Sequence, residues 1–228
     1  MKRCVIFAAA DIDNYNAVKK RINPDDFIIC ADGGVRHALV LGIEPNSIIG
    51  DFDSFDIEKY NFNCKVIRLN TVKDDTDSMS AVREGIKNGC REFLFFGILG
   101  GRIDHTLANL HLLEYLDKNC CKGTMLYDKS EIIFLKNNKI ILKKDKYENF
   151  SLIILSETAN NVTIKGAKYN LENAVITRLY QYGISNVFES DTVKISIGDG
   201  SKLIFSVKRA KSAGAKLGVH LSLISLYR

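Results

Sequence analysis

The first half of the chain alternates short apolar runs with longer amphipathic segments. Apolar runs of strand length occupy residues 3–9, 27–31, 47–50, 65–69 and 93–99. Segments with apolar residues at every third or fourth position predict helices at residues 34–41, 78–90 and 106–116. Asp77 or Ser78 is the expected N-cap of the second helix. This alternation predicts an α/β domain built on a mostly parallel sheet.

The pattern changes after about Asp128. Shorter, strand-like runs follow at residues 131–135, 139–142, 152–156, 161–164, 174–177, 192–197 and 202–207. Asparagine, glycine and aspartate residues that favour turns separate them. We therefore expect an all-β second domain, a sandwich or barrel, with the division at residues 1–128 and 129–228. Residues 210–228 fit neither half, and a last strand, a short helix and a disordered tail all remain open for them.

The composition narrows the class of protein. A chain of 228 residues with 46% hydrophobic content is large enough to bury a core without disulfides or metals to hold it. The net charge of +5 is spread along the chain, so we expect no nucleic-acid partner. The chain has no apolar run of about 18 residues, so we expect no membrane segment either. The six cysteines form no C-x-x-C pair, which predicts reduced thiols in a cytoplasmic protein.

Acidic and glycine-rich sequence follows most predicted strands of the first half. These ends carry Asp32, Gly33 and Gly34; Asp51 and Asp53; Lys73, Asp74 and Asp77; and Gly100, Gly101, Arg102, Asp104 and His105. Parallel strands bring their carboxyl ends to one edge of the sheet, where open α/β sheets bind ligands. Crowded carboxylates there call for a cation, and Mg²⁺ held by carboxylates and substrate phosphates is the simplest choice. The paired glycines, Lys73 and Arg102 suit phosphate oxygens.

Each of these pieces has an ordinary structural explanation when it is taken alone. Asp-Gly-Gly is often only a turn, Asp-x-Asp is a common turn pattern, and acidic residues before a helix often serve as caps. Their recurrence at successive strand ends favours one shared, Mg²⁺-dependent site for phosphoryl or diphosphoryl transfer. Asp51, Asp53, Asp74 and Asp77 carry this prediction.

In this order and spacing, the motifs resemble those of the thiamine pyrophosphokinase family. They are Ala-Asp-Gly-Gly at 31–34, Gly-Asp-Phe-Asp-Ser at 50–54, Lys-Asp-Asp-Thr-Asp at 73–77 and Gly-Gly-Arg-Ile-Asp-His at 100–105. In the second half, Gly-Ile-Ser-Asn at 183–186 is similar to the family's thiamine-side motif. The resemblance covers residues 3–207, nearly the whole chain.

The resemblance implies an enzyme that moves the diphosphoryl group of ATP to the hydroxyl of thiamine, giving thiamine diphosphate and AMP. It implies an ATP-binding catalytic domain at residues 1–128, a thiamine-binding β-sandwich at 129–228 and a homodimer. By position, Asp51, Asp53 and Asp77 match the family's Mg²⁺ ligands. Residues that match the lining of the nucleotide and thiamine sites are Asp32, Asp74, Arg102, Asp104, Ser185 and Asn186. Asp74 and Asp104 are both candidates to accept the hydroxyl proton.

Two other functions remain open. Asp51 and Asp53, separated by Phe52, also resemble the nucleophile motif of haloacid-dehalogenase-type phosphatases, in which Asp51 would be phosphorylated and Asp53 would be the acid. That motif ordinarily ends the first strand of its fold, whereas two predicted strands precede it here. The second alternative is a non-catalytic module that senses nucleotide, which would bind ATP without releasing AMP.

Overall fold

The computed structural model describes residues 1–53, 56–70 and 75–209. The chain divides into two compact units, Met1–Asp128 and Lys129–Arg228, called here the N-terminal and C-terminal units. Residues 210–228, for which a strand, a helix and a disordered tail were all left open, lie outside the described residues. Among the described residues, no helix is long and apolar enough to cross a membrane.

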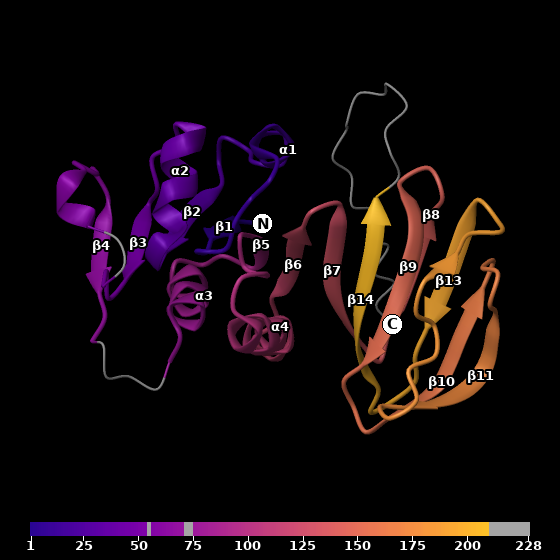
Figure 1. The fold of residues 1–228 in the computed structure, drawn as a ribbon. Helices are drawn as coiled ribbons and strands as arrows, with labels where there is room; N and C mark the ends of the chain where they lie inside the picture. The colour runs from indigo at the N-terminus through magenta and orange to yellow at the C-terminus, as the bar shows by residue number, and fades with distance from the viewer. Residues whose placement is uncertain (54–55, 71–74, 210–228) are drawn as a thin grey trace. The chain divides into compact units, whose positions relative to one another are not determined.

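The N-terminal unit is built on a parallel sheet (Figure 1). Its strands are β1 (Arg3–Phe7), β2 (Phe27–Ala31), β3 (Ser47–Gly50), β4 (Lys65–Arg68), β5 (Glu92–Phe96) and β6 (Lys122–Tyr127). They lie in the order β6-β5-β1-β2-β3-β4. The central strands are buried except for the first residue of β1, β2 and β5, as expected when helices cover both faces of a sheet.

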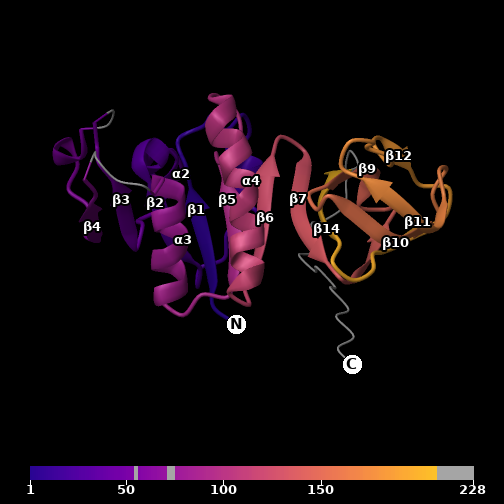
Figure 2. The ribbon, with the colours of Figure 1, turned by 90° about the horizontal axis from the view of Figure 1, so that it is seen from below.

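Successive strand residues point to opposite sides of the sheet. Because the central strands are apolar along most of their length, both faces are apolar and helices cover both. The helical elements are α1 (Tyr15–Lys19), η1 (Asp32–Gly34), α2 (Val35–Leu41), η2 (Ile57–Lys59), α3 (Asp77–Lys87) and α4 (Ile103–Lys118). Val5 and Phe7 pack in one core cluster with residues of α1 and α2. On the other face, Cys4 lies against α3 at Gly85, and Phe95 lies near α4. Figure 2 shows α3 and α4 side by side on this face.

The predicted α/β class of the first half is confirmed, with differences in detail. The N-cap of α3 is Thr76, whose side chain accepts a hydrogen bond from the Met79 N–H, so Asp77 or Ser78 as the N-cap was wrong. The helix ends at Lys87 rather than at residue 90. Four elements of this unit were not predicted: the five-residue helix α1, the short 3-10 helices η1 and η2, and strand β6.

The C-terminal unit consists of two antiparallel sheets. Its strands are β7 (Ser130–Lys136), β8 (Lys139–Lys143), β9 (Tyr147–Ile154), β10 (Thr158–Lys165), β11 (Leu171–Thr177), β12 (Asn186–Val187), β13 (Thr192–Ser196) and β14 (Lys202–Arg209). One sheet has the order β12-β9-β14-β7 and the other the order β11-β10-β13-β8. The two-residue strand β12 was not predicted.

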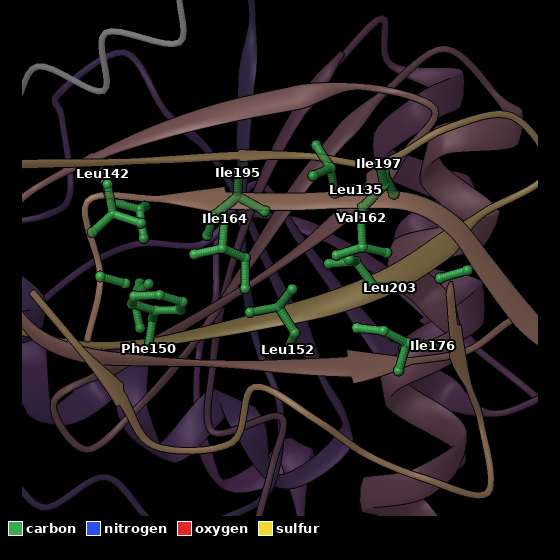
Figure 3. Packing of buried hydrophobic residues seen from close by; sticks show 14 of the residues in the cluster. Leu135, Leu142, Phe150, Leu152, Val162, Ile164, Ile176, Ile195, Ile197 and Leu203 are labelled. Carbon is green, nitrogen blue, oxygen red and sulfur yellow. The ribbon is translucent and has the colours of Figure 1, made fainter. Parts of the chain in front are cut away.

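A single apolar core lies between these two sheets (Figure 3). Phe150 and Leu152 of β9 meet Ile164 of β10 and Ile195 of β13 there, and all four side chains are almost fully buried. Alternate residues of β9, β10 and β13 point into this core, which packs one sheet against the other, so the unit is a β-sandwich.

Candidate active site

The strand order of the N-terminal unit identifies where a ligand should bind. From β1 the chain moves outward through β2, β3 and β4, and then returns to place β5 on the other side of β1. Open α/β sheets bind ligands outside the carboxyl ends of the strands at such a reversal. The crevice is therefore expected where Phe7 ends β1 and Phe96 ends β5.

Three carboxylates gather beside this point. Asp32 follows β2, and Asp51 and Asp53 follow β3, the next strand of the sheet. One oxygen from each of the three lies within 4.8 Å of the others. Asp32 and Asp51 are half-buried and Asp53 is exposed. Carboxylates this close repel one another, so the group is suited to hold a cation.

The local sequence explains how these carboxylates come together. Asp32 has a φ of 45° and Phe52 a φ of 59°, in the left-handed region, so the chain turns sharply after each strand. Gly50 ends β3 against Asp32, and a Cβ on Gly50 would lie 3.0 Å from the Asp32 Cα atom. Gly34 lies against the end of β1, where a Cβ would be 2.1 Å from the carbonyl oxygen of Phe7. The glycines thus let three strand ends approach closely.

The sequence grouped Asp51 and Asp53 with Asp77, whereas Asp32 is the third member of this group. Asp77 is the first residue of α3, after the connection from β4, and is half-buried. Lys73 and Asp74 lie outside the described residues. The assignment of metal ligands therefore stays a prediction, with Asp32 added to its candidates.

The loop after β5 holds the last acidic motif. Gly100 and Gly101 have φ values of 98° and 68°, and the Gly100 N–H donates to Thr106 Oγ1 at 3.0 Å. At the start of α4, Arg102 forms a two-point ion pair with Asp104, with distances of 3.2 Å from Nε to Oδ1 and 2.6 Å from the terminal nitrogen to Oδ2.

This ion pair changes the chemistry of Asp104. The Arg102 guanidinium, together with the backbone N–H of His105, lowers the pKa of Asp104 from 3.8 to about 2. A carboxylate with so low a pKa is a weak proton acceptor. The Arg102 and Asp104 side chains are 72% and 61% exposed, so both can reach a ligand.

In the C-terminal unit, the last two residues of the thiamine-side motif, Ser185 and Asn186, differ in exposure. Ser185 is exposed and has a φ of 56°. Asn186 is 1% exposed, and its side chain is engaged by the main chain. Its Oδ1 accepts from the Tyr169 N–H at 3.1 Å, and its Nδ2 donates to the Tyr169 carbonyl at 2.8 Å. Asn186 therefore holds the turn that carries the exposed Tyr169 ring.

Comparison with known proteins identifies the family. Residues 18–125 match the family model "Thiamin pyrophosphokinase, catalytic domain", and residues 137–201 match "Thiamin pyrophosphokinase, vitamin B1 binding domain". Thiamine pyrophosphokinase of Bacillus subtilis is 32% identical over 165 residues, which cover 69% of this chain and 76% of the relative. The chain belongs to the thiamine pyrophosphokinase family.

Other members of the family extend this result. Thiamine pyrophosphokinase 1 of Oryza sativa is 26% identical over 208 residues, covering 78% of this chain and 77% of the relative. The crystal structure of thiamine pyrophosphokinase from Bacillus subtilis superposes with a TM-score of 0.81 at 27% identity, covering 92% of this chain and all of that one. The resemblance drawn from the motifs is thus confirmed as family membership.

Proposed function

We propose that this protein is a thiamine pyrophosphokinase, which transfers the diphosphoryl group of ATP to the hydroxyl of thiamine and releases thiamine diphosphate and AMP. The observation that carries the proposal is the group of Asp32, Asp51 and Asp53, in a chain whose two halves match the catalytic and vitamin B1 binding models of one family. The N-terminal unit would bind ATP, and the C-terminal unit would help to bind thiamine.

The carboxylate group fits Mg²⁺. Ligand oxygens on one Mg²⁺ ion lie roughly 3–4 Å apart, given metal–oxygen distances of about 2.1 Å. The three oxygens lie within 4.8 Å of one another, so at most a small inward movement would bring them to that spacing. We assign Asp51 and Asp53 as ligands with Asp32 beside them, and keep Asp77 as a further candidate. When bound, Mg²⁺ would supply the positive charge that stabilises the phosphates as the leaving group departs.

The protein's own groups position the reactants. In diphosphoryl transfer the thiamine hydroxyl attacks the β-phosphorus in line with the departing AMP, so orientation and charge stabilisation are the main contributions. Arg102 supplies an exposed guanidinium at the β5 end, and Asp104 holds that guanidinium in place through its two-point contact. The lowered pKa of Asp104 favours this positioning role over proton acceptance. Asp74 remains the other candidate for the general base, and Lys73 remains a candidate phosphate contact.

The thiamine side would be organised by the C-terminal unit. Asn186 fixes the turn at Tyr169, a residue that is 58% exposed and whose ring could stack on a flat aromatic substrate in place of the Lys168 ammonium, which lies 5.5 Å from the ring centroid. Ser185, the residue before Asn186, is exposed and offers a hydroxyl. Asn186 therefore acts through Tyr169 in this proposal, while Ser185 is the candidate for direct contact.

One assay tests the reaction and its rivals together. The protein is incubated with ATP, Mg²⁺ and thiamine, and nucleotides and thiamine esters are separated by chromatography. AMP and thiamine diphosphate in equal amounts support the proposal. Inorganic phosphate with phosphorylated Asp51 would support a phosphatase of the haloacid-dehalogenase type, although Asp51 follows the third strand of the chain here rather than the first. Bound ATP without AMP would support a nucleotide sensor.

A second experiment tests the metal site. Asp53→Asn should abolish turnover, and Mg²⁺ should no longer raise the melting temperature of the variant as it does for the wild type. The metal-free variant should be at least as stable as the metal-free wild type, because one of three crowded charges is gone. The matched control is Asp25→Asn, an exposed aspartate before the amino end of β2. Normal Mg²⁺-dependent activity in Asp53→Asn would refute the metal assignment.

We further propose a homodimer that works in the reducing cytoplasm. The connection after β11 exposes Leu179, Tyr180, Tyr182 and Ile184, at 90%, 69%, 55% and 49%. A cluster of exposed apolar side chains of this kind often marks an interface. Sedimentation of the wild type should give a dimer, and Leu179→Glu should shift it toward monomer; a monomeric wild type would refute the dimer.

All six cysteines are free, which supports the proposed location in a reducing compartment, the cytoplasm.

A further inference from the structure

The loop after β1 is held by hydrogen bonds from α2. The Arg36 guanidinium donates to the Ala9 carbonyl at 2.6 Å and to Asp11 Oδ1 at 2.7 Å. The next residue, His37, reaches the Ala10 carbonyl with its Nε2 atom at 2.9 Å. Because α2 begins directly after η1, the element that includes Asp32, this loop is tied to the segment that supplies part of the carboxylate group.

His37 is the buried member of this arrangement. The residue is only 1% exposed, and both ring nitrogens have hydrogen-bond partners. A carbonyl oxygen only accepts, so Nε2 must carry the proton and donate to Ala10. In the neutral ring, Nδ1 then accepts from the Tyr15 hydroxyl at 2.7 Å. Burial lowers the pKa of His37, which favours this neutral form.

The same loop is also bonded to β5. The Ala8 N–H donates to the Phe96 carbonyl at 2.9 Å, and the Ala10 N–H donates to the Gly97 carbonyl at 2.8 Å. Ala10 thus receives a hydrogen bond from His37 at its carbonyl and gives one to Gly97 from its amide. The loop lies between β1 and β5, at the reversal of strand order where a ligand is expected.

We propose that His37, supported by Tyr15, is a positioning residue that holds residues 8–10 in the conformation that the nucleotide requires. This inference rests on the proposed function, because it assigns ATP as the ligand whose binding depends on the loop. An apolar side chain could fill the same buried volume, but it could not hold the Ala10 carbonyl. The exposed Ala9, whose Cβ atom lies 3.4 Å from where a Cβ of Gly33 would be, places this loop next to the Asp-Gly-Gly turn.

Graded variants test the inference. His37→Leu removes both hydrogen bonds and should raise the KM for ATP about five- to tenfold, as expected for one or two neutral hydrogen bonds. Tyr15→Phe removes one and should raise it about two- to threefold. His37→Gln can still donate to Ala10 and should stay within about twofold of the wild type. The KM for thiamine and kcat should change little in all three.

Hydrogen exchange provides a readout that does not depend on activity. The amides of Ala8 and Ala10 should exchange faster in His37→Leu than in the wild type. Without His37 the loop is held less tightly, so the hydrogen bonds from these amides to Phe96 and Gly97 should open more often. The matched control is Leu116→Ala, which removes a fully buried side chain of α4. It should lower the melting temperature without raising the KM for ATP.

The outcomes separate this inference from the proposed function. If the wild type makes no AMP, the proposed function fails, and exchange together with ATP binding by calorimetry still decides the inference. An unchanged KM and unchanged exchange in His37→Leu would overturn the inference alone. An equal rise of the KM in Leu116→Ala would also overturn it, because the effect would then be general destabilisation. If His37→Leu does not fold, Tyr15→Phe and His37→Gln carry the test.

Discussion

Gly97→Ala is the substitution for which the structure makes the sharpest stability prediction. Gly97 follows β5 with a φ of 60°, a conformation that side chains rarely adopt. An added Cβ atom would lie 2.5 Å from the Ala8 carbonyl oxygen and 2.7 Å from the Ala10 carbonyl oxygen. Both are backbone atoms, and the loop that carries them is bonded to β5 and to His37. The loop must therefore move if the methyl group is to fit.

The size of the effect follows from three contributions. The left-handed conformation costs an alanine roughly 1–2 kcal/mol, and forcing a methyl group into packed surroundings costs typically about 1–3 kcal/mol. The lower entropy of the unfolded chain returns about 0.4–1 kcal/mol. The free energy of unfolding should therefore fall by about 1–5 kcal/mol, with about 3 kcal/mol as the central value.

Gly42→Ala is the matched control. Gly42 ends α2 with a φ of 65°, nearly the same conformation, and nothing lies within 4 Å of an added Cβ. It should lose only the conformational part, about 1 kcal/mol or less. Both glycines belong to the N-terminal unit, so both variants report on the same part of the fold.

Urea denaturation followed by far-UV circular dichroism measures both variants against the wild type. The difference between Gly97→Ala and Gly42→Ala isolates the cost of the contact with the loop. Equal losses of stability in the two variants would refute the argument, because the close approach at Gly97 would then contribute nothing. Gly97→Ala should also raise the KM for ATP, whereas Gly42→Ala should not.

Three further predictions follow from single contacts. Thr76→Ala removes the N-cap of α3 and should lower the free energy of unfolding by about 1 kcal/mol; no change in the urea midpoint would contradict the cap. Arg102→Leu should raise the pKa of Asp104 from about 2 toward 3.8, measured by NMR titration. Since the folded pKa is the lower one, the Arg102–Asp104 pair stabilises the fold above pH 3.8, and this contribution is lost as the pH falls through about 2. Asp26→Asn leaves the half-buried Arg3 guanidinium without its two-point partner, although its bond to the Arg21 carbonyl remains, and should cost about 1.5–3 kcal/mol; a loss below about 1 kcal/mol would show that this pair behaves like an exposed one.

Local patterns were enough to predict the helices α3 and α4, the central parallel strands and the change of class between the two halves, whereas β9 begins at Tyr147, five residues before the strand predicted at 152–156. The central strands of the first half are continuous apolar runs, and α3 has a strong helical period, so tertiary packing reinforced what local sequence favoured. Strand β6 was missed because its residues, Lys-Gly-Thr-Met-Leu-Tyr, carry few apolar positions and only Met125 is fully buried. The helix α1 is too short to show a period.

By itself, the sequence determined which residues stand at the ends of the parallel strands, and the order of the motifs was enough to indicate the family. Which of these side chains meet depended on the tertiary structure, because strand order and glycine contacts are not local properties. Gly50 and Gly34 bring Asp32 to Asp51 and Asp53, a grouping that spacing along the chain did not predict. His37 and Asn186 illustrate the same limit, since their partners lie 27 and 17 residues away and become neighbours only when the chain folds.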